Sequence, residues 1–152
     1  MISFADLKRF EIFKDLNESE AGIIQEKASF QEYDEGKRIF AENSLATNLY
    51  LLLEGKVDIK MSSTTKKEII TVDTVKPNEI FGWSAITDPF TFTAAAWTAE
   101  KCKIIAISGE ALGNLFKINN QLGYKVSKKI ATVISRRLRR LHLRLADYMA
   151  EN

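Results

Sequence analysis

The side chains that most often carry out nucleophilic, acid–base or metal chemistry are scarce in this sequence. Its 152 residues contain one cysteine, Cys102, and one histidine, His142. A structural zinc site uses four Cys or His ligands, and a nucleophilic cysteine is activated by a neighbouring base. With one residue of each type, far apart in the chain, we expect no metal site and interpret Cys102 as a small buried apolar residue. Because no paired acids or nucleophile–base set is visible either, we expect a protein that is not an enzyme and that uses no cofactor.

The segment from Phe81 to Thr98 has the most unusual composition in the chain. It contains no Lys or Arg, and its only charged residue is Asp88. Its aromatic residues are Phe81, Trp83, Phe90, Phe92 and Trp97. Small-molecule sites are mostly apolar with a few well-placed polar groups, which Ser84, Thr87, Thr91 and Thr93 would supply here. The segment is therefore either an apolar ligand site without a charged anchor or a set of core aromatics.

Short helices and then short strands must position this segment. Ser3 is expected to cap a helix over residues 4–10, and Asn17 or Ser19 to cap one that runs to Lys27. Beyond these helices, polar turns separate runs typical of strands, at residues 30–33, 38–40, 49–53, 56–61, 68–72, 91–98 and 103–108. The runs 49–53 and 56–61 flank Glu54-Gly55 and predict a hairpin. Strands without intervening helices indicate an antiparallel sandwich or barrel.

Two helices are expected at the C-terminal end, over residues 109–117 and 119–149, the second of them about 45 Å long. Apolar residues spaced alternately three and four apart form a seam typical of coiled coils, consisting of Ala131, Ile134, Leu138, Leu141, Leu145 and Tyr148. A second apolar stripe lies mostly in the earlier half, at Leu122, Val126, Ile130 and Val133. Either the first half packs on the barrel and the second half pairs with a second copy of the chain, or the whole helix folds back on its own domain.

Charge is distributed unevenly along the chain. Residues 119–152 hold eight basic and two acidic residues, a net charge of +6, whereas the remainder carries −4. This asymmetry indicates an interaction helix or contact with an anionic partner, such as an acidic protein. No apolar run approaches the ~18 residues needed to span a membrane, the N-terminus lacks the layout of a secretory signal, and a lone Cys favours a reducing compartment. We therefore expect a cytoplasmic protein.

Several short motifs, in this order of elements, resemble the cyclic-nucleotide-binding domain of the catabolite activator and FNR (Crp/Fnr) regulator family. They are Asp34-Glu35-Gly36 with Ile39-Phe40, the run from Leu49 to Val57, Asn78-Glu79-Ile80-Phe81-Gly82 at the entry to the phosphate-binding cassette, and Pro89 with Thr93-Ala94 at its exit. The resemblance covers about residues 5–149. It implies a mainly β fold, an eight-stranded antiparallel β-roll with short N-terminal helices and a long C-terminal dimerisation helix. We expect residues 1–118 to form the roll with its short helices, and residues 119–152 to form the long helix of the same domain.

The same resemblance implies that the ligand-binding residues lie in the cassette, at Phe81, Gly82, Trp83, Ser84, Ala85, Thr91, Phe92, Thr93 and Ala94. This sequence departs from the family pattern at its two polar contacts. Where family members usually carry a Glu that accepts a hydrogen bond from the ribose, this chain has Trp83; where they carry an Arg that binds the cyclic phosphate, it has Thr91 or Phe92. Truncating one partner of a buried charge pair costs roughly 2–5 kcal/mol, about 30- to several-thousand-fold in affinity. Conventional cyclic-nucleotide binding is therefore disfavoured.

Three functional interpretations remain, and all of them describe a non-catalytic regulatory module. Either the pocket binds another ligand, or the aromatics fill it and leave an interaction scaffold, or cyclic nucleotide binds weakly or in a non-standard way. Family regulators usually continue into a helix-turn-helix, for which a chain ending at Asn152 has no room. We therefore expect no sequence-specific DNA binding by this chain alone. Arg136, Arg137, Arg139 and Arg140 either contact phosphates non-specifically or form a solvated helix face.

Overall fold

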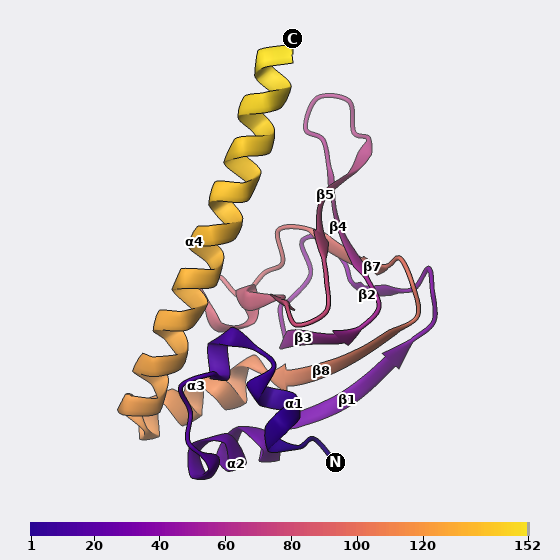
Figure 1. The fold of residues 1–152 in the computed structure, drawn as a ribbon. Coiled ribbons are helices and arrows are strands. Elements are labelled where there is room, and N and C mark those ends of the chain that lie inside the picture. The colour runs from indigo at the N-terminus through magenta and orange to yellow at the C-terminus, as the bar shows by residue number, and fades with distance from the viewer. Residues whose placement is uncertain (152) are drawn as a thin grey trace.

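A computed structural model describes residues 1–151 of the chain (Figure 1). The helical elements are α1 (Phe4–Lys8), η1 (Glu11–Phe13), α2 (Glu18–Glu26), η2 (Trp83–Ile86), α3 (Gly109–Ile118) and α4 (Asn120–Glu151). The strands are β1 (Ala28–Tyr33), β2 (Arg38–Phe40), β3 (Asn48–Glu54), β4 (Val57–Ser62), β5 (Ile69–Val75), β6 (Ile80–Phe81), β7 (Ala95–Thr98) and β8 (Cys102–Ser108). Within residues 1–151 these strands form two four-stranded antiparallel sheets, in the orders β1-β8-β3-β6 and β2-β7-β4-β5. The predicted eight-stranded antiparallel roll with a long C-terminal helix is confirmed.

Strand β3 explains why the run Leu49–Leu53 is continuously apolar. Its residues alternate between two cores, because successive side chains of a strand point to opposite faces of the sheet. Leu49, Leu51 and Leu53 pack in an outer core beneath the helices. Tyr50 and Leu52 pack in an inner core between the two sheets. A strand buried on both faces reads as an apolar run rather than as an alternating pattern.

The predicted hairpin between residues 49–53 and 56–61 is wrong. Strands β3 and β4 follow one another in the chain but belong to different sheets, and β4 instead pairs with β5. Gly55 carries the chain from one sheet to the other with φ +99°, and a Cβ atom there would lie 2.4 Å from the carbonyl oxygen of Lys101. A Glu-Gly turn alone therefore does not distinguish a hairpin from a crossover between sheets. The two-residue strand β6 was also not predicted.

The N-terminal helices begin where the sequence indicates. Ser3 caps α1 and Asn17 caps α2, each with a reciprocal capping box through Asp6 and Glu20 respectively. Helix α1 ends at Lys8, earlier than expected, and residues 11–13 form the separate turn η1.

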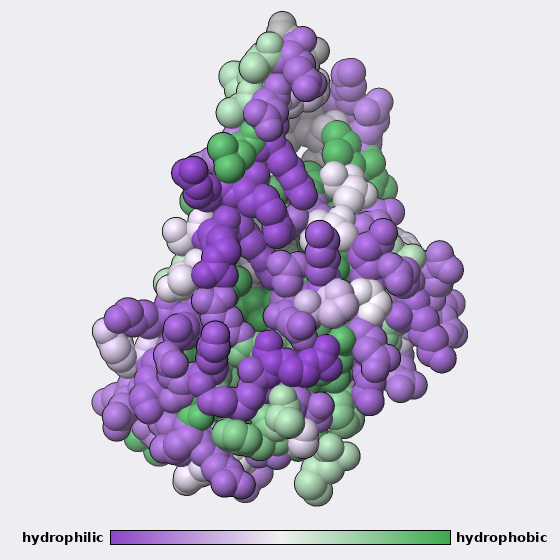
Figure 2. Space-filling view, in the orientation of Figure 1, coloured by the Kyte–Doolittle hydropathy of each residue, from purple (hydrophilic) through white to green (hydrophobic). Residues whose placement is uncertain are grey.

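The two halves of α4 have different surroundings. Leu122, Val126 and Ile130 in the first half are buried in the outer core, which confirms that this half packs on the domain. The second half continues past the roll, alongside the β4–β5 hairpin (Figure 1). In this part of the view, hydrophobic residues of α4 and of the hairpin are visible at the surface (Figure 2). The large apolar side chains that are exposed on this half of α4 and on the hairpin are Met61, Ile69, Ile70, Leu138, Leu143, Leu145, Tyr148 and Met149.

The basic face of α4 pairs with the acidic body of the same chain. Arg136 donates two hydrogen bonds to Glu11, at 2.7 and 3.1 Å, and this contact lowers the pKa of Glu11. The other ion pairs are Lys125–Glu20, Lys129–Asp15, Arg140–Asp73, Arg140–Glu79 and Arg144–Asp73. Many of the basic residues of α4 are therefore paired with carboxylates from the rest of the same chain.

Candidate ligand-binding pocket

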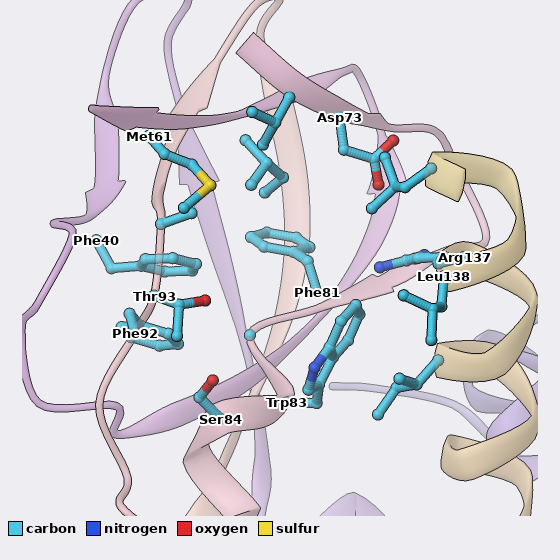
Figure 3. Close-up of a pocket in the computed structure, with 16 residues that line it drawn as sticks. Phe40, Met61, Asp73, Phe81, Trp83, Ser84, Phe92, Thr93, Arg137 and Leu138 are labelled. Atoms are coloured by element: carbon cyan, nitrogen blue, oxygen red, sulfur yellow. The ribbon is translucent and has the colours of Figure 1, made fainter. Parts of the chain in front are cut away.

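A cavity of about 260 Å³ lies between the cassette, the sheet β2-β7-β4-β5 and helix α4 (Figure 3). The sheet contributes Phe40, Ile59, Met61, Val72 and Asp73. The cassette and the loop after it contribute Phe81, Gly82, Trp83, Ser84, Phe92, Thr93 and Ala94. Helix α4 contributes Ile134, Arg137, Leu138 and Leu141. The lining is largely apolar, which is typical of small-molecule sites.

Aromatic rings form one wall of the cavity. The rings of Phe40 and Phe92 stack with their centroids 3.6 Å apart and an angle of 11° between their planes. Phe81 stacks on Tyr50 at 5.1 Å. The Phe81–Tyr50 pair lies within the centroid range of roughly 4.5–7 Å in which aromatic pairs add about 0.5–1.5 kcal/mol beyond the burial of area. The aromatics are thus partly packed on one another, yet they leave space in front of α4.

The cassette backbone is held in place by glycines. Gly82 has φ +78°, and a Cβ atom there would lie 2.9 Å from the Tyr50 ring and 3.0 Å from the carbonyl oxygen of Asn48. The turn η2 follows directly. Gly109 at the start of α3 lies against Ala85, whose carbonyl oxygen would be 2.1 Å from an added Cβ atom. The cassette is therefore fixed between β3 and α3 and presents Trp83 and Ser84 to the cavity.

The structure brings most of the predicted cassette residues to the cavity, with two exceptions. Ala85 is buried in the inner core. Thr91 pairs with Leu45 in an isolated β-bridge and, like Ala85, does not line the cavity. Of the other aromatics in this segment, Phe90 is 41% exposed, and Trp97 lies against the guanidinium of Arg38. The aromatic character of the segment thus serves several separate contacts rather than one.

Sequence reasoning missed the helix side of the cavity, above all Arg137. This residue is only 6% exposed although it lies on the most polar helix of the chain. Its guanidinium carbon lies 4.9 Å from the centroid of the Trp83 ring, and Figure 3 shows the side chain extending from α4 toward Phe81 and Trp83. Its Nη2 atom is buried without a hydrogen-bond partner. Burial lowers the pKa of Arg137, as does nearby Arg140, while Glu79 and Asp73 raise it; the net direction is downward.

A charged cluster lies next to Arg137, and its member Asp73 lines the cavity. Asp73 on β5 is 7% exposed and accepts two hydrogen bonds from Nη2 of Arg140, at 2.7 and 2.9 Å. Arg144 lies 3.6 Å from the same carboxylate. Glu79 lies 3.6 Å from Arg140. Since Asp73 also accepts the backbone N–H of Thr74 at 2.9 Å, its carboxylate is fully engaged on the side of β5 and α4.

Two further observations concern metal-ligating and thiol side chains. Within residues 1–151 no group of three or more His, Cys, Asp or Glu side chains is arranged to hold a metal ion. Cys102 is buried in the inner core, and burial raises the pKa of its thiol, which opposes formation of the reactive thiolate.

Within residues 1–151 no helix is long and apolar enough to cross a membrane.

Comparison with known proteins agrees with this architecture. Residues 30–119 match the model of the cyclic nucleotide-binding domain. The chain belongs to the cyclic nucleotide-binding domain family. The resemblance to a cyclic nucleotide-binding domain is thereby confirmed, and its Crp-like character is supported by the relatives that follow. A CRP-like cAMP-activated global transcriptional regulator of Mycobacterium tuberculosis is 26% identical over 142 residues, which are 93% of this chain and 61% of the regulator.

Solved structures show the same fold. A protein of Geobacter metallireducens described as a cyclic nucleotide-binding protein is 30% identical, with a TM-score of 0.81 over 91% of this chain and 99% of its own. The catabolite activator protein of Thermus thermophilus is 26% identical, with a TM-score of 0.74 over 92% of this chain and 63% of its own. The chain thus spans somewhat less than two thirds of the length of the regulators it matches. The lining residues from Phe40 to Ala94 fall within the matched residues 30–119, and those of α4 lie beyond them.

Proposed function

We propose that this chain is a non-catalytic, ligand-sensing regulatory module whose cavity binds a small molecule other than cyclic nucleotide in its usual pose. The observation that carries the proposal is the cavity itself, which is lined by the roll on one side and by α4 on the other. A ligand in this position contacts both parts and stabilises one arrangement of the helix relative to the roll. A ligand shifts such an equilibrium only by its differential affinity for the two arrangements.

The cavity supports sensing over the scaffold interpretation, in which side chains fill the pocket. The aromatics Phe40 and Phe92 pack on each other, and about 260 Å³ remains beside them. Binding of cyclic nucleotide in the usual pose is disfavoured. The position expected to bind the sugar holds Trp83, the position expected to bind the phosphate holds Thr91 or Phe92, and none of these side chains is charged. The proposal places this module in the cytoplasm, in line with its single unpaired Cys102.

We further infer that the second half of α4 pairs with a second copy of the chain. Ile134, Leu138 and Leu141 of the predicted seam line the cavity, and Leu138 and Leu145 remain half exposed. The predicted seam at Ala131, Ile134, Leu138, Leu141, Leu145 and Tyr148 would then form the dimer contact. Residues 1–118 and the long helix act as one unit in this proposal, so a ligand that moves the helix changes the dimer.

The experiment is calorimetric titration of the chain with 2-naphthoate, 2-naphthamide, cyclic AMP and cyclic GMP. We expect at least one naphthalene compound to bind with one-to-one stoichiometry. Cyclic AMP and cyclic GMP should not saturate the protein at the concentrations at which that compound does. Thr93→Trp should abolish binding because Thr93 lines the cavity, whereas Thr87→Trp, at an exposed threonine outside it, should not. The proposal fails if no compound binds, if Thr93→Trp leaves binding unchanged, or if cyclic AMP binds most tightly.

A further inference from the structure

We propose that Arg137 is the anion-binding residue of the cavity and that the ligand is a small organic anion with a flat apolar body. The inference rests on the proposed sensing function and adds the chemical class of the ligand. It starts from a contrast along α4. Arg136 is paired with Glu11 and Arg140 with Asp73, whereas within residues 1–151 Arg137 between them has no carboxylate in ion-pair contact, and its buried Nη2 atom has no hydrogen-bond partner.

A buried guanidinium without an anionic partner is unusual. Arg137 is 6% exposed, and its Nη2 atom is buried with no hydrogen-bond acceptor. Buried charges in proteins are normally paired, because losing water without gaining a partner is costly. The face of the Trp83 ring at 4.9 Å compensates for part of this cost but accepts no hydrogen bond in the plane of the guanidinium. The planar fork of an arginine suits two oxygens of a carboxylate or phosphate.

The charges around Arg137 leave room for one more anion. The cluster contains three cations, Arg137, Arg140 and Arg144, and two carboxylates, Asp73 and Glu79. Asp73 lines the cavity and would repel an anion if it were free. It is instead held by two short hydrogen bonds from Arg140 and lies close to Arg144. The cluster therefore has a net charge of +1, and Arg137 is the member that faces the cavity without a partner.

The remaining lining determines the body of the ligand. Phe81 and the stacked pair Phe40 and Phe92 provide flat apolar surfaces, while Ile59 and Met61 close the cavity from β4. A volume of about 260 Å³ lies just below the range of roughly 300–1,000 Å³ of drug-sized sites. A ligand that fits both the aromatic wall and Arg137 is small, flat and apolar, and carries its negative charge at the end next to α4.

The position of the cation gives it a regulatory consequence. In the resemblance drawn from the sequence, the phosphate-binding arginine belongs to the roll, and in this chain that part of the roll carries no positive charge. Here the cation belongs to α4 and the aromatic wall belongs to the roll. An anion bound to Arg137 while its body packs on Phe40 and Phe92 therefore joins the helix to the roll directly.

The test compares three probes that share a ring system and differ in charge, namely 2-naphthoate, 2-naphthyl phosphate and 2-naphthamide, titrated calorimetrically into the full chain. We expect at least one anion to bind about 30-fold or more tighter than the neutral amide, the loss expected when one partner of a buried charge pair is missing. In Arg137→Met this preference should fall to about threefold or less. Arg139→Met is the matched control, because Arg139 is exposed on the same helix and does not line the cavity, and it should behave as the wild type.

Each outcome decides between the two claims. If 2-naphthamide binds the wild type as tightly as the anions, or if Arg137→Met keeps the preference for anions, the inference is wrong while the cavity remains a ligand site. If none of the three probes binds, both the inference and the proposed sensing function fail. A preference for 2-naphthyl phosphate over 2-naphthoate, or the reverse, identifies which anionic group the site takes, and either result supports the inference.

Discussion

Replacing Arg137 by methionine should stabilise the ligand-free protein. The guanidinium is buried and one of its nitrogens has no acceptor. The pKa of Arg137 is lowered, chiefly by burial. When the pKa of a cation is lower in the folded chain than in the unfolded chain, the charged group destabilises the folded state. This cost applies at every pH at which the group is charged in the unfolded chain, and for arginine that includes neutral pH. Methionine removes the charge and keeps an unbranched apolar chain against Trp83.

The size of the effect follows from two opposing contributions. An unsatisfied buried donor costs roughly 1–3 kcal/mol, and more when it is charged. The cation–π contact with Trp83, which the substitution removes, is worth roughly 0.5–2 kcal/mol. The difference is a gain of about 1 kcal/mol, because methionine still packs on the ring. For a chain of this length, that gain raises the melting temperature by roughly 2–4 °C.

Scanning calorimetry of the wild type, Arg137→Met and Arg139→Met without ligand measures this directly. The Arg139 variant should lie within about 0.5 kcal/mol of the wild type, as surface substitutions usually do. Adding an anionic probe at about 100 times its Kd should stabilise the wild type by about 2.7 kcal/mol and reverse the order. If Arg137→Met melts below the wild type without ligand, Arg137 is already adequately paired within the chain and the reasoning is refuted.

Three further results are expected. Asp73→Asn weakens the contact to Arg140 and should lower the free energy of unfolding by roughly 1–2 kcal/mol in urea titrations. The loss is smaller than for a fully buried pair because Arg140 is about a third exposed. An unchanged free energy of unfolding would contradict the role of this pair. The Arg136 hydrogen bonds lower the pKa of Glu11 from its ordinary 4.5, so the pair stabilises the fold above that pH and is lost as pH falls through the lowered pKa. Glu11→Gln should therefore lose less stability than the wild type between about pH 6 and about pH 3, and equal losses would argue against it. Leu145→Glu should convert a dimer to a monomer in sedimentation velocity, and an unaltered sedimentation coefficient would place the dimer contact elsewhere.

Local sequence signals predicted the elements because the physics that fixes them is local. Ser3 and Asn17 cap helices through their own next turn. The absence of charge between Phe81 and Thr98 except for Asp88 predicted an apolar cassette, and Phe92 indeed packs against Phe40. Gly82 was placed in the site by resemblance, and its positive φ and its close approach to Tyr50 show why a side chain is not tolerated there.

The errors arose where distant parts of the chain decide the outcome. The hairpin at Glu54-Gly55 failed because pairing depends on which strands are already beside β3, namely β8 and β6. Arg137 was grouped with Arg136 and Arg139 as one basic face, because sequence periodicity shows which side of a helix a residue occupies but not what lies opposite. A position three residues after Ile134 and four before Leu141 does fall on the apolar stripe, and this spacing was the signal that could have identified it.

The location of positive charge is what distinguishes this pocket from one in which the anion site has simply been lost. If the aromatic cassette had only replaced an abandoned site, an apolar residue at position 137 would suit its surroundings better than an arginine whose buried Nη2 atom has no hydrogen-bond partner. The chain instead holds Arg137 against the ring of Trp83, the residue that stands where the resemblance expects a carboxylate, and keeps Asp73 occupied by Arg140. A carboxylate at position 83 would pair with Arg137 and close the site to anions, so Trp83 keeps the cation available. Trp83→Glu should therefore abolish binding of 2-naphthoate and raise the melting temperature of the free protein, whereas weaker binding together with a lower melting temperature would indicate that Trp83 acts only as packing.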